Sequence, residues 1–454
     1  MKLRLTGNNS DKLKLRYLDA GLALLALLAY IIYLTGNYFL PVPGVYALLV
    51  VLLLLVCGVA ARLYLTYHPG VLVFRQAMVK GWPLLILLLA VLVGGFLRFQ
   101  AIRTAGDVAN QPEAIKFAQS AQAIINTSDW QPKSFTQPPL YLYLAAGVSE
   151  LQFVQQASAG KINSPEGLKP VDISTAVTYV NLLLGLLTLV AVWAGARLFW
   201  RTEIAGIVAA LLLATSWLAY QGIPRLEPQF LAAFLLSLSF YFIAQGCDTG
   251  KLWDYRWAGF FAGLATAAAY SSILLLLLLG LSLFILKQEG SRVRLAWNSG
   301  LAFLLGLTLA APGWLLSLQF FIPGLVSIGK APGDAAGFYF KQALTNDAGL
   351  VMAFGVTLLL AFVLRESRLW LALIMPLLYA LLVCVFGPAL VERLVLITPL
   401  VAISGAFPVV WAARKGAEWL EKKRGRAYPW LHAGLTLALT VGVILVSVLV
   451  RRFF

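Results

Sequence analysis

Residues 173–199 read ISTAVTYVNLLLGLLTLVAVWAGARLF, an apolar run whose one charged residue, Arg197, stands near its end. A helix rises about 1.5 Å per residue, so about 20 apolar residues cross the roughly 30 Å hydrocarbon core of a bilayer. This run is therefore long enough to span a membrane. Similar runs recur along the whole chain, and the sequence predicts an all-α, polytopic membrane protein.

The composition supports the same class of protein. Of 454 residues, 61% are hydrophobic and 12% are charged, whereas a soluble domain carries about a quarter charged residues. The net charge of +16 fits either nucleic-acid binding or the basic cytoplasmic ends of membrane helices. The second interpretation is favoured because the basic residues fall in short loops at alternating helix ends. No nucleic-acid partner is expected.

Cysteines and histidines indicate no cross-linked or metal-bound framework. The three cysteines lie in or beside apolar runs without paired spacing, which gives no disulfide framework. The two histidines, His68 and His432, lie in separate segments, which excludes a histidine-rich metal site. No residue is therefore assigned as a metal ligand.

The apolar runs predict about thirteen membrane spans. They are expected at 18–37, 44–64, 82–101, 173–199, 203–220, 228–245, 257–270, 272–286, 296–318, 349–364, 369–386, 388–411 and 431–450. The stretch 257–286 could form one long tilted helix, but AYSS at 269–272 favours a turn between two short spans. The basic N-terminus runs into an apolar segment without a small-residue cleavage site, so the first span is expected to remain uncleaved.

Lysines and arginines concentrate at alternate helix ends. One set of ends includes Arg16, Arg62, Arg201, Arg256, Arg368 and the cluster RKGAEWLEKKRGR at 414–426. The opposite loops GNYFLPVP and QGIPRLEP carry almost no basic residue. Because positive loops stay inside, we expect a multi-pass protein of the plasma or inner membrane with a cytoplasmic N-terminus. The C-terminus is then outside, which puts Arg451 and Arg452 on the outer side against the usual bias.

Two segments remain outside the membrane in this topology, 102–172 and 319–347. The first contains NQPEAIKFAQSAQAIINTSDWQPKSFTQPPLYLYLA at 110–145. Apolar residues at helical spacing predict an amphipathic helix at 113–125 lying on the outer membrane surface. The prolines that open 138–153 predict a second surface helix.

The order of features around this loop resembles a known family. Arg98 in the last turn of a span, then QPEAIKFAQSAQAI, SDW and PPLYLYL, is similar to the first outer loop of the GT-C glycosyltransferases that use polyprenyl-phosphate sugars. Protein O-mannosyltransferases and the aminoarabinose transferase of lipid A are branches of this family. The stretches 181–199, 225–241 and 392–406 extend the resemblance. It implies a GT-C-like core at 82–454, preceded by a two-span addition at 1–81.

The resemblance implies transfer of a sugar, with inversion, from a polyprenyl-phosphate donor to an acceptor glycan, lipid or protein. A carboxylate must take the proton of the attacking hydroxyl, and cations or a metal must stabilise the departing phosphate. Glu113 matches the Asp-Glu pair of the family, with Ala114 in the second place, and Asp107 is the alternative base. Asn110 and Glu113 also have the spacing of a capping box, so capping and catalysis both remain open.

For the phosphate, the candidates are Arg225 and Arg393, with Glu227 beside the first. A charge inside a span is usually functional, but Arg393 could also snorkel to the interface or pair with an acid. The Tyr and Leu stripe at 140–144 is expected to pack rather than bind substrate. One carboxylate in the loop helix gives little support for a divalent cation, but leaves room for one.

Four further basic residues near the outer side receive other roles. Arg98 and Arg103 flank the loop entrance and are expected to anchor lipid headgroups. Lys330 and Lys341 lie in GKAPGDAAGFYFKQ, which is either a lid over the site or a plain solvated connector.

Three functions compete. The first is an integral-membrane glycosyltransferase acting on the outer side. The second is a non-catalytic membrane subunit that keeps the scaffold but lacks the acid pair. A transporter is the third and the least favoured, because the spans carry few ionisable residues away from their ends.

Overall fold

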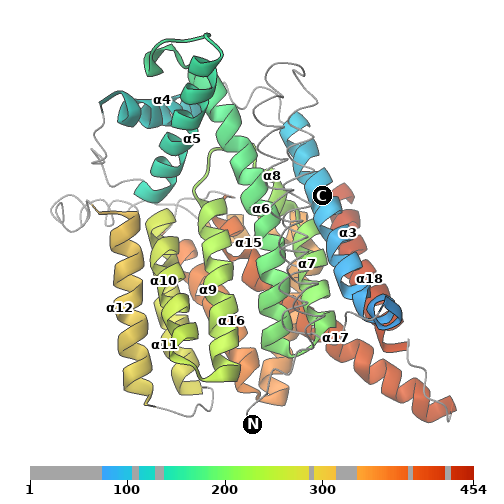
Figure 1. The fold of residues 1–454 in the computed structure, drawn as a ribbon. Helices are drawn as coiled ribbons and strands as arrows, with labels where there is room; N and C mark the ends of the chain where they lie inside the picture. Colours follow the sequence, from blue (N-terminus) through green and yellow to red (C-terminus); the bar gives the residue numbers. More distant parts are fainter. Residues whose placement is uncertain are drawn as a thin grey trace. The chain divides into compact units, whose positions relative to one another are not determined.

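The computed structural model describes residues 74–104, 112–127, 138–285, 291–312, 335–386, 392–424 and 431–453. Within these ranges every regular element is a helix (Figure 1). The chain divides into two compact units, Met1–Leu89 and Ala90–Phe454. The first two predicted spans and nearly all of the predicted addition at 1–81 lie outside the described residues. The scaffold and the candidate site belong to the second unit.

The described elements are all helices and follow one another along the chain. They are α3 (Phe74–Thr104), α4 (Pro112–Thr127), α5 (Pro139–Ser158), the 3-10 turn η3 (Pro165–Gly167), α6 (Pro170–Trp200), α7 (Glu203–Thr215), α8 (Trp217–Gln221), α9 (Gln229–Thr249), α10 (Leu252–Ala268), η4 (Tyr270–Ile273), α11 (Leu274–Ile285), α12 (Arg292–Ala310), α15 (Ala335–Leu364), α16 (Ser367–Phe386), α17 (Glu392–Arg424) and α18 (Leu431–Phe453).

The all-α, polytopic class is confirmed. In the described part of the chain, seven helices are long and apolar enough to cross a membrane, namely Pro83–Thr104, Pro170–Trp200, Gln229–Thr249, Arg292–Ala310, Gly337–Leu364, Arg393–Lys423 and Leu431–Arg451. Three shorter apolar helices lie at Glu203–Thr215, Tyr270–Phe284 and Ser367–Leu381. The turn predicted at AYSS is present as η4, so 257–286 forms two helices and not one.

The span predicted at 203–220 is wrong in one respect, because it is broken. The helix ends at Thr215, and Ser216 adopts extended backbone angles before the five-residue α8 begins. Ser216 then caps α8 by accepting a hydrogen bond from the Ala219 N–H. A serine that caps a new helix competes with continuation of the old one.

Helix ends that the charge pattern groups together do meet in space. Asp248, at the end of α9, pairs with Arg201 after α6 and with Arg368 at the start of α16. The Arg368 guanidinium also donates to the Phe199 carbonyl over 2.7 Å. These contacts place the end of α6, the end of α9 and the start of α16 at the same end of the bundle, as the charge pattern predicts. The side of the membrane on which this end lies stays a prediction.

Glycines let α10 and α12 approach closely. A Cβ at Gly263 would lie 2.1 Å from the Phe303 carbonyl oxygen, and one at Gly306 would lie 2.3 Å from that of Phe260. Small residues at such crossings replace the hydrophobic driving force that helices lack in lipid. The resulting pair forms one wall of the bundle (Figure 1).

Both helices predicted in the first outer loop exist. α4 and α5 lie beyond the ends of α9, α10 and α12 in Figure 1. The most buried face of α4 is formed by Ala114, Ala118, Ala121 and Ile124, and α4 packs on α5 and α6. Protein therefore covers this face. Whether the helix also lies along the membrane surface stays a prediction.

The loop predicted at 319–347 is wrong in its last part. Residues 335–347 already belong to α15, which contains one non-helical residue, Asp347 (φ −134°, ψ 44°). Lys341 thus lies on a helix and not in a lid or a loose connector. Lys330 lies outside the described residues.

Candidate functional site

The turn between α8 and α9 is held against α6 and α5 by a chain of hydrogen bonds. The Asn181 side-chain amide in α6 donates to the Arg225 carbonyl over 3.2 Å. The Tyr141 hydroxyl in α5 donates to the Asn181 Oδ1 over 3.1 Å. Asn181 is fully buried and Tyr141 is 1% exposed, so each polar atom needs the other. These hydrogen bonds fix turn 222–228, whose Arg225 side chain is exposed.

The same tyrosine connects the turn to α4. The Phe117 and Tyr141 rings stack with 5.2 Å between their centroids. Glu113 is the second residue of α4, one helical turn before Phe117. The backbone of α4 therefore holds the candidate base in the first turn of a helix that packs directly on the tyrosine. Asp107 lies outside the described residues.

Glu227 contributes negative charge to this cluster. Burial raises the pKa of Tyr141 above its ordinary value, and the Glu227 carboxylate raises it further, while the hydrogen bond with Asn181 opposes both. The phenol consequently stays neutral and remains the donor to Asn181. Glu227 itself is half-buried and lies within electrostatic reach of the tyrosine.

Arg393 begins α17 beside the other end of the turn. It is the second residue of the helix. The span predicted from sequence, 388–411, would have put it about one turn inside. Its carbonyl accepts a hydrogen bond of 2.9 Å from the buried Tyr379 hydroxyl, and its side chain is half-buried. Gly222 faces Val395, with 3.7 Å between an added Cβ and the Val395 Cγ2. The structure therefore brings the first turn of α17 to turn 222–228.

The prediction that Arg98 anchors a lipid headgroup is wrong. Its side chain is 1% exposed, and its Nη1 donates to the carbonyls of Gly94 at 3.1 Å and Ala214 at 3.4 Å. Within the described residues its Nε has no hydrogen-bond partner. Glycines at 94 and 185 leave the space that the guanidinium fills. Arg103, by contrast, is exposed and lies over the Phe99 ring at 5.0 Å.

A divalent cation finds no ready ligand set in the described part of the chain. No group of three His, Cys, Asp or Glu side chains is close enough there to hold a metal ion. Asp107 and the Glu113 side chain are outside that search. We therefore assign no step to a metal.

Three residues of the site were missed from sequence. Asn181 and Tyr141 connect the predicted segments, and Asp347 is a buried acid behind the turn. An amide inside the predicted span 173–199 could have indicated Asn181, because polar groups inside spans usually have partners. The Tyr and Leu stripe packs, as expected, but Tyr141 also carries a hydrogen bond.

Comparison with known proteins finds a sequence likeness for part of this arrangement. Residues 172–315 match the sequence model of the dolichyl-phosphate-mannose-protein mannosyltransferase family, which is less than half of the chain. No curated protein matches the chain in sequence. The matched region includes α6, turn 222–228 and α9 to α12.

Solved structures extend the likeness over most of the chain. ArnT from Cupriavidus metallidurans, solved with undecaprenyl phosphate, has a TM-score of 0.54 at 14% identity, covering 82% of this chain and 73% of that one. AglB, the archaeal oligosaccharyltransferase of Archaeoglobus fulgidus solved with an inhibitory peptide and a dolichol-phosphate, has a TM-score of 0.54 at 13% identity. The aligned region covers 82% of this chain and only 55% of AglB. At such identities the likeness establishes the fold alone, which this chain shares with ArnT and AglB.

Proposed function

We propose that this protein is an integral-membrane glycosyltransferase that moves a sugar from a polyprenyl-phosphate donor to an acceptor on the outer side of the membrane. The observation that carries the proposal is the junction of α4, α5, α6 and turn 222–228 through Tyr141 and Asn181. It gathers an acid-bearing helix and an exposed arginine at one end of a GT-C fold. The structural neighbours solved with dolichol-phosphate and undecaprenyl phosphate support the donor class.

In this proposal Glu113 takes the proton of the attacking acceptor hydroxyl, with Asp107 as the alternative base. Arg225 and Arg393 stabilise the phosphate that departs as the sugar is transferred with inversion. Glu227 lies two residues after Arg225 and orients it or the sugar. The donor is a lipid, so the reacting bond lies at headgroup depth, and the acceptor is a glycan, a lipid or a protein.

The proposed location follows the charge pattern of the helix ends. The protein crosses the plasma or inner membrane several times, with its N-terminus in the cytoplasm. The 102–172 segment and turn 222–228 then lie on the outer side. A transporter is disfavoured because the predicted spans carry few ionisable residues away from their ends.

One observation favours a second candidate, a non-catalytic subunit on the same scaffold. Ala114 stands at the position of the second acid and is 6% exposed. A buried apolar side chain therefore takes the place of the second carboxylate. The second candidate keeps lipid binding and lacks transfer.

Transfer by the wild type separates the two candidates, and the change Glu113→Gln tests the assigned base. Glutamine keeps an oxygen that can cap α4 but cannot accept the hydroxyl proton, so transfer should fall about 10²–10⁴-fold while thermal stability stays unchanged. Transfer is measured with purified protein and a radiolabelled polyprenyl-phosphate sugar. Lys116→Gln, one turn further on the exposed face of α4, is the matched control and should retain activity. An undiminished rate in Glu113→Gln rejects catalysis by Glu113.

A further inference from the structure

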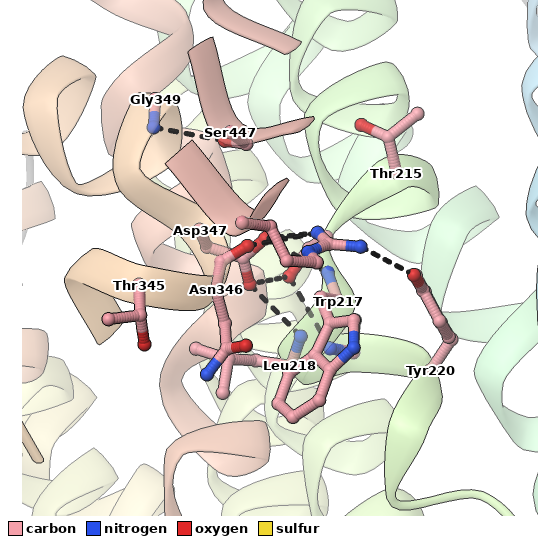
Figure 2. A network of polar contacts seen from close by, with 12 residues as sticks. Thr215, Trp217, Leu218, Tyr220, Thr345, Asn346, Asp347, Gly349 and Ser447 are labelled. Atoms are coloured by element: carbon pink, nitrogen blue, oxygen red, sulfur yellow. Dashed lines mark hydrogen bonds and ion pairs between the residues drawn. The ribbon is translucent and has the colours of Figure 1, made fainter. Parts of the chain in front are cut away.

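A buried acidic residue, Asp347, interrupts α15 where this helix packs against α18. Asp347 is 1% exposed and has non-helical backbone angles. A break of this kind leaves backbone groups without partners in the helix. Two of them find partners in α18: the Gly349 N–H donates to the Ser447 Oγ over 2.9 Å, and the Asn346 carbonyl accepts from the Arg451 Nη2 over 2.9 Å (Figure 2).

The Asp347 side chain contacts the start of α8. Its Oδ2 accepts from the Ser216 hydroxyl at 2.7 Å and from the Leu218 N–H at 3.0 Å. Its Oδ1 accepts from the Trp217 N–H at 2.9 Å (Figure 2). These are N–H groups of the first helical turn, which have no partner inside a helix. A helix of five residues has little stability of its own, so the position of α8 depends on Asp347.

Arg451 holds the same small helix from the other side. Its Nη1 donates to the Tyr220 hydroxyl over 2.8 Å, and its Nη2 lies 3.9 Å from the Asp347 Oδ1. The guanidinium carbon lies 5.9 Å from the centre of the Trp217 ring. A planar guanidinium can serve several such partners at once. This inward contact also explains an arginine at the helix end where the orientation rule disfavours one.

The helix held in this way leads directly into turn 222–228. Tyr220 is followed by Gln221 and then by Gly222, which packs on Phe230 and on α17. Further along, the Arg225 carbonyl is held by Asn181. The turn is therefore fixed at both ends, by the Asp347 network at its entry and by Asn181 near its exit.

We propose that Asp347 and Arg451 form a clamp that positions turn 222–228, and with it Arg225 and Glu227, for binding the phosphate of the donor. Both are positioning residues, because they act through α8. The phosphate part rests on the proposed glycosyltransferase function, whereas the clamp itself does not. The inference makes α18 a working part of the site.

The first test measures opening of the turn without any substrate. Ile223 is fully buried, so Ile223→Cys reacts with a maleimide only when the turn opens. The full chain carries this cysteine in a background where Cys57, Cys247 and Cys384 are serine. Labelling should be roughly ten-fold faster or more after Asp347→Asn or Arg451→Ala, because a hydrogen bond to a buried charge is worth at least such a factor.

Ser447→Ala is the matched control. It removes the bond between α18 and the Gly349 N–H but touches no atom of α8, so the labelling rate should not change. Unchanged labelling in Asp347→Asn and Arg451→Ala overturns the clamp. An equal rise in Ser447→Ala also overturns it, since the effect would then report general loosening of α18.

The second test measures transfer kinetics in detergent with a polyprenyl-phosphate sugar. Asp347→Asn and Arg451→Ala should raise the donor KM roughly ten-fold, with the acceptor KM unchanged, and Arg451→Lys should restore part of the loss by returning the charge beside Asp347. Faster labelling with an unchanged donor KM overturns the link to phosphate and leaves the clamp standing. If the wild type transfers no sugar, the proposed function fails, and the labelling result alone decides the clamp.

Discussion

Arg98 is the residue whose environment departs furthest from its expected role. An arginine in the last turns of a span normally extends to the interface. Here the side chain fills a space left by Gly94 and Gly185. A Cβ at Gly94 would lie 2.9 Å from the Arg98 Nη1, and one at Gly185 would lie 3.0 Å from the Arg98 Nε. The side chain folds inward because two glycines on different helices make room. A reading along one helix cannot detect such a space, because half of it is provided by α6.

The change Arg98→Met tests how Arg98 contributes to stability. Within the described residues the hydrogen bonds of the buried Arg98 go to neutral carbonyls. Replacement of buried charges by apolar groups of similar volume is often neutral or stabilising by about 1–4 kcal/mol. Arg98→Met should therefore match or exceed the wild type in thermal unfolding in detergent.

Arg98→Lys is the comparison for that measurement. It keeps the charge but loses the planar fork that reaches two carbonyls, so it should be less stable than Arg98→Met. If Arg98→Met is the less stable of the two, the Arg98 guanidinium has an anionic partner in addition to the two carbonyls.

At the scale of helices, hydropathy and spacing predicted most elements. α4 and α5 followed from apolar periodicity and from the double proline, and the spans followed from run length. The breaks at Ser216 and Asp347 were not predicted, because each depends on partners from distant helices. Asp347 stabilises the break after α7, and Ser447 and Arg451 satisfy the break in α15. Nothing near either residue in the sequence distinguishes them from ordinary polar residues.

Helix contact through glycine gives a prediction at this scale. Gly263→Ala adds a Cβ against a backbone carbonyl, which cannot rotate away, so α10 and α12 must separate at a cost of about 1–3 kcal/mol in the free energy of unfolding. Gly300 lies on α12 with nothing within 4 Å of an added Cβ.

Gly300→Ala is therefore the control, and should be neutral or stabilising by up to about 1 kcal/mol through helix propensity. Thermal unfolding of both variants in one detergent provides the comparison. Equal stability of the two variants would show that α10 and α12 are not packed this closely.

Across the described helices, an ion-pair cluster lies at one end and the candidate site lies at the other. Asp248 joins Arg201 and Arg368 at one end, whereas Tyr141, Asn181 and the Arg225 turn meet at the other. The sequence predicted the basic residues Arg201 and Arg368 at the first end and named Arg225 as a candidate at the second. It did not predict how turn 222–228 is held, because Asn181 and Tyr141 read as ordinary members of apolar runs. The proposed transfer on the outer side requires that the end with turn 222–228 faces the outside.

Single cysteines determine which end that is. Ser164, before η3, and Lys415, in α17, are both exposed and lie at opposite ends of the predicted topology. In the background without native cysteines, Ser164→Cys in intact cells should react with a membrane-impermeant maleimide, because the 102–172 segment is outside. Lys415→Cys should react only after the cells are opened, since basic clusters stay in the cytoplasm. Labelling of Lys415→Cys in intact cells would reverse the orientation. It would put turn 222–228 in the cytoplasm and end the case for transfer on the outer side.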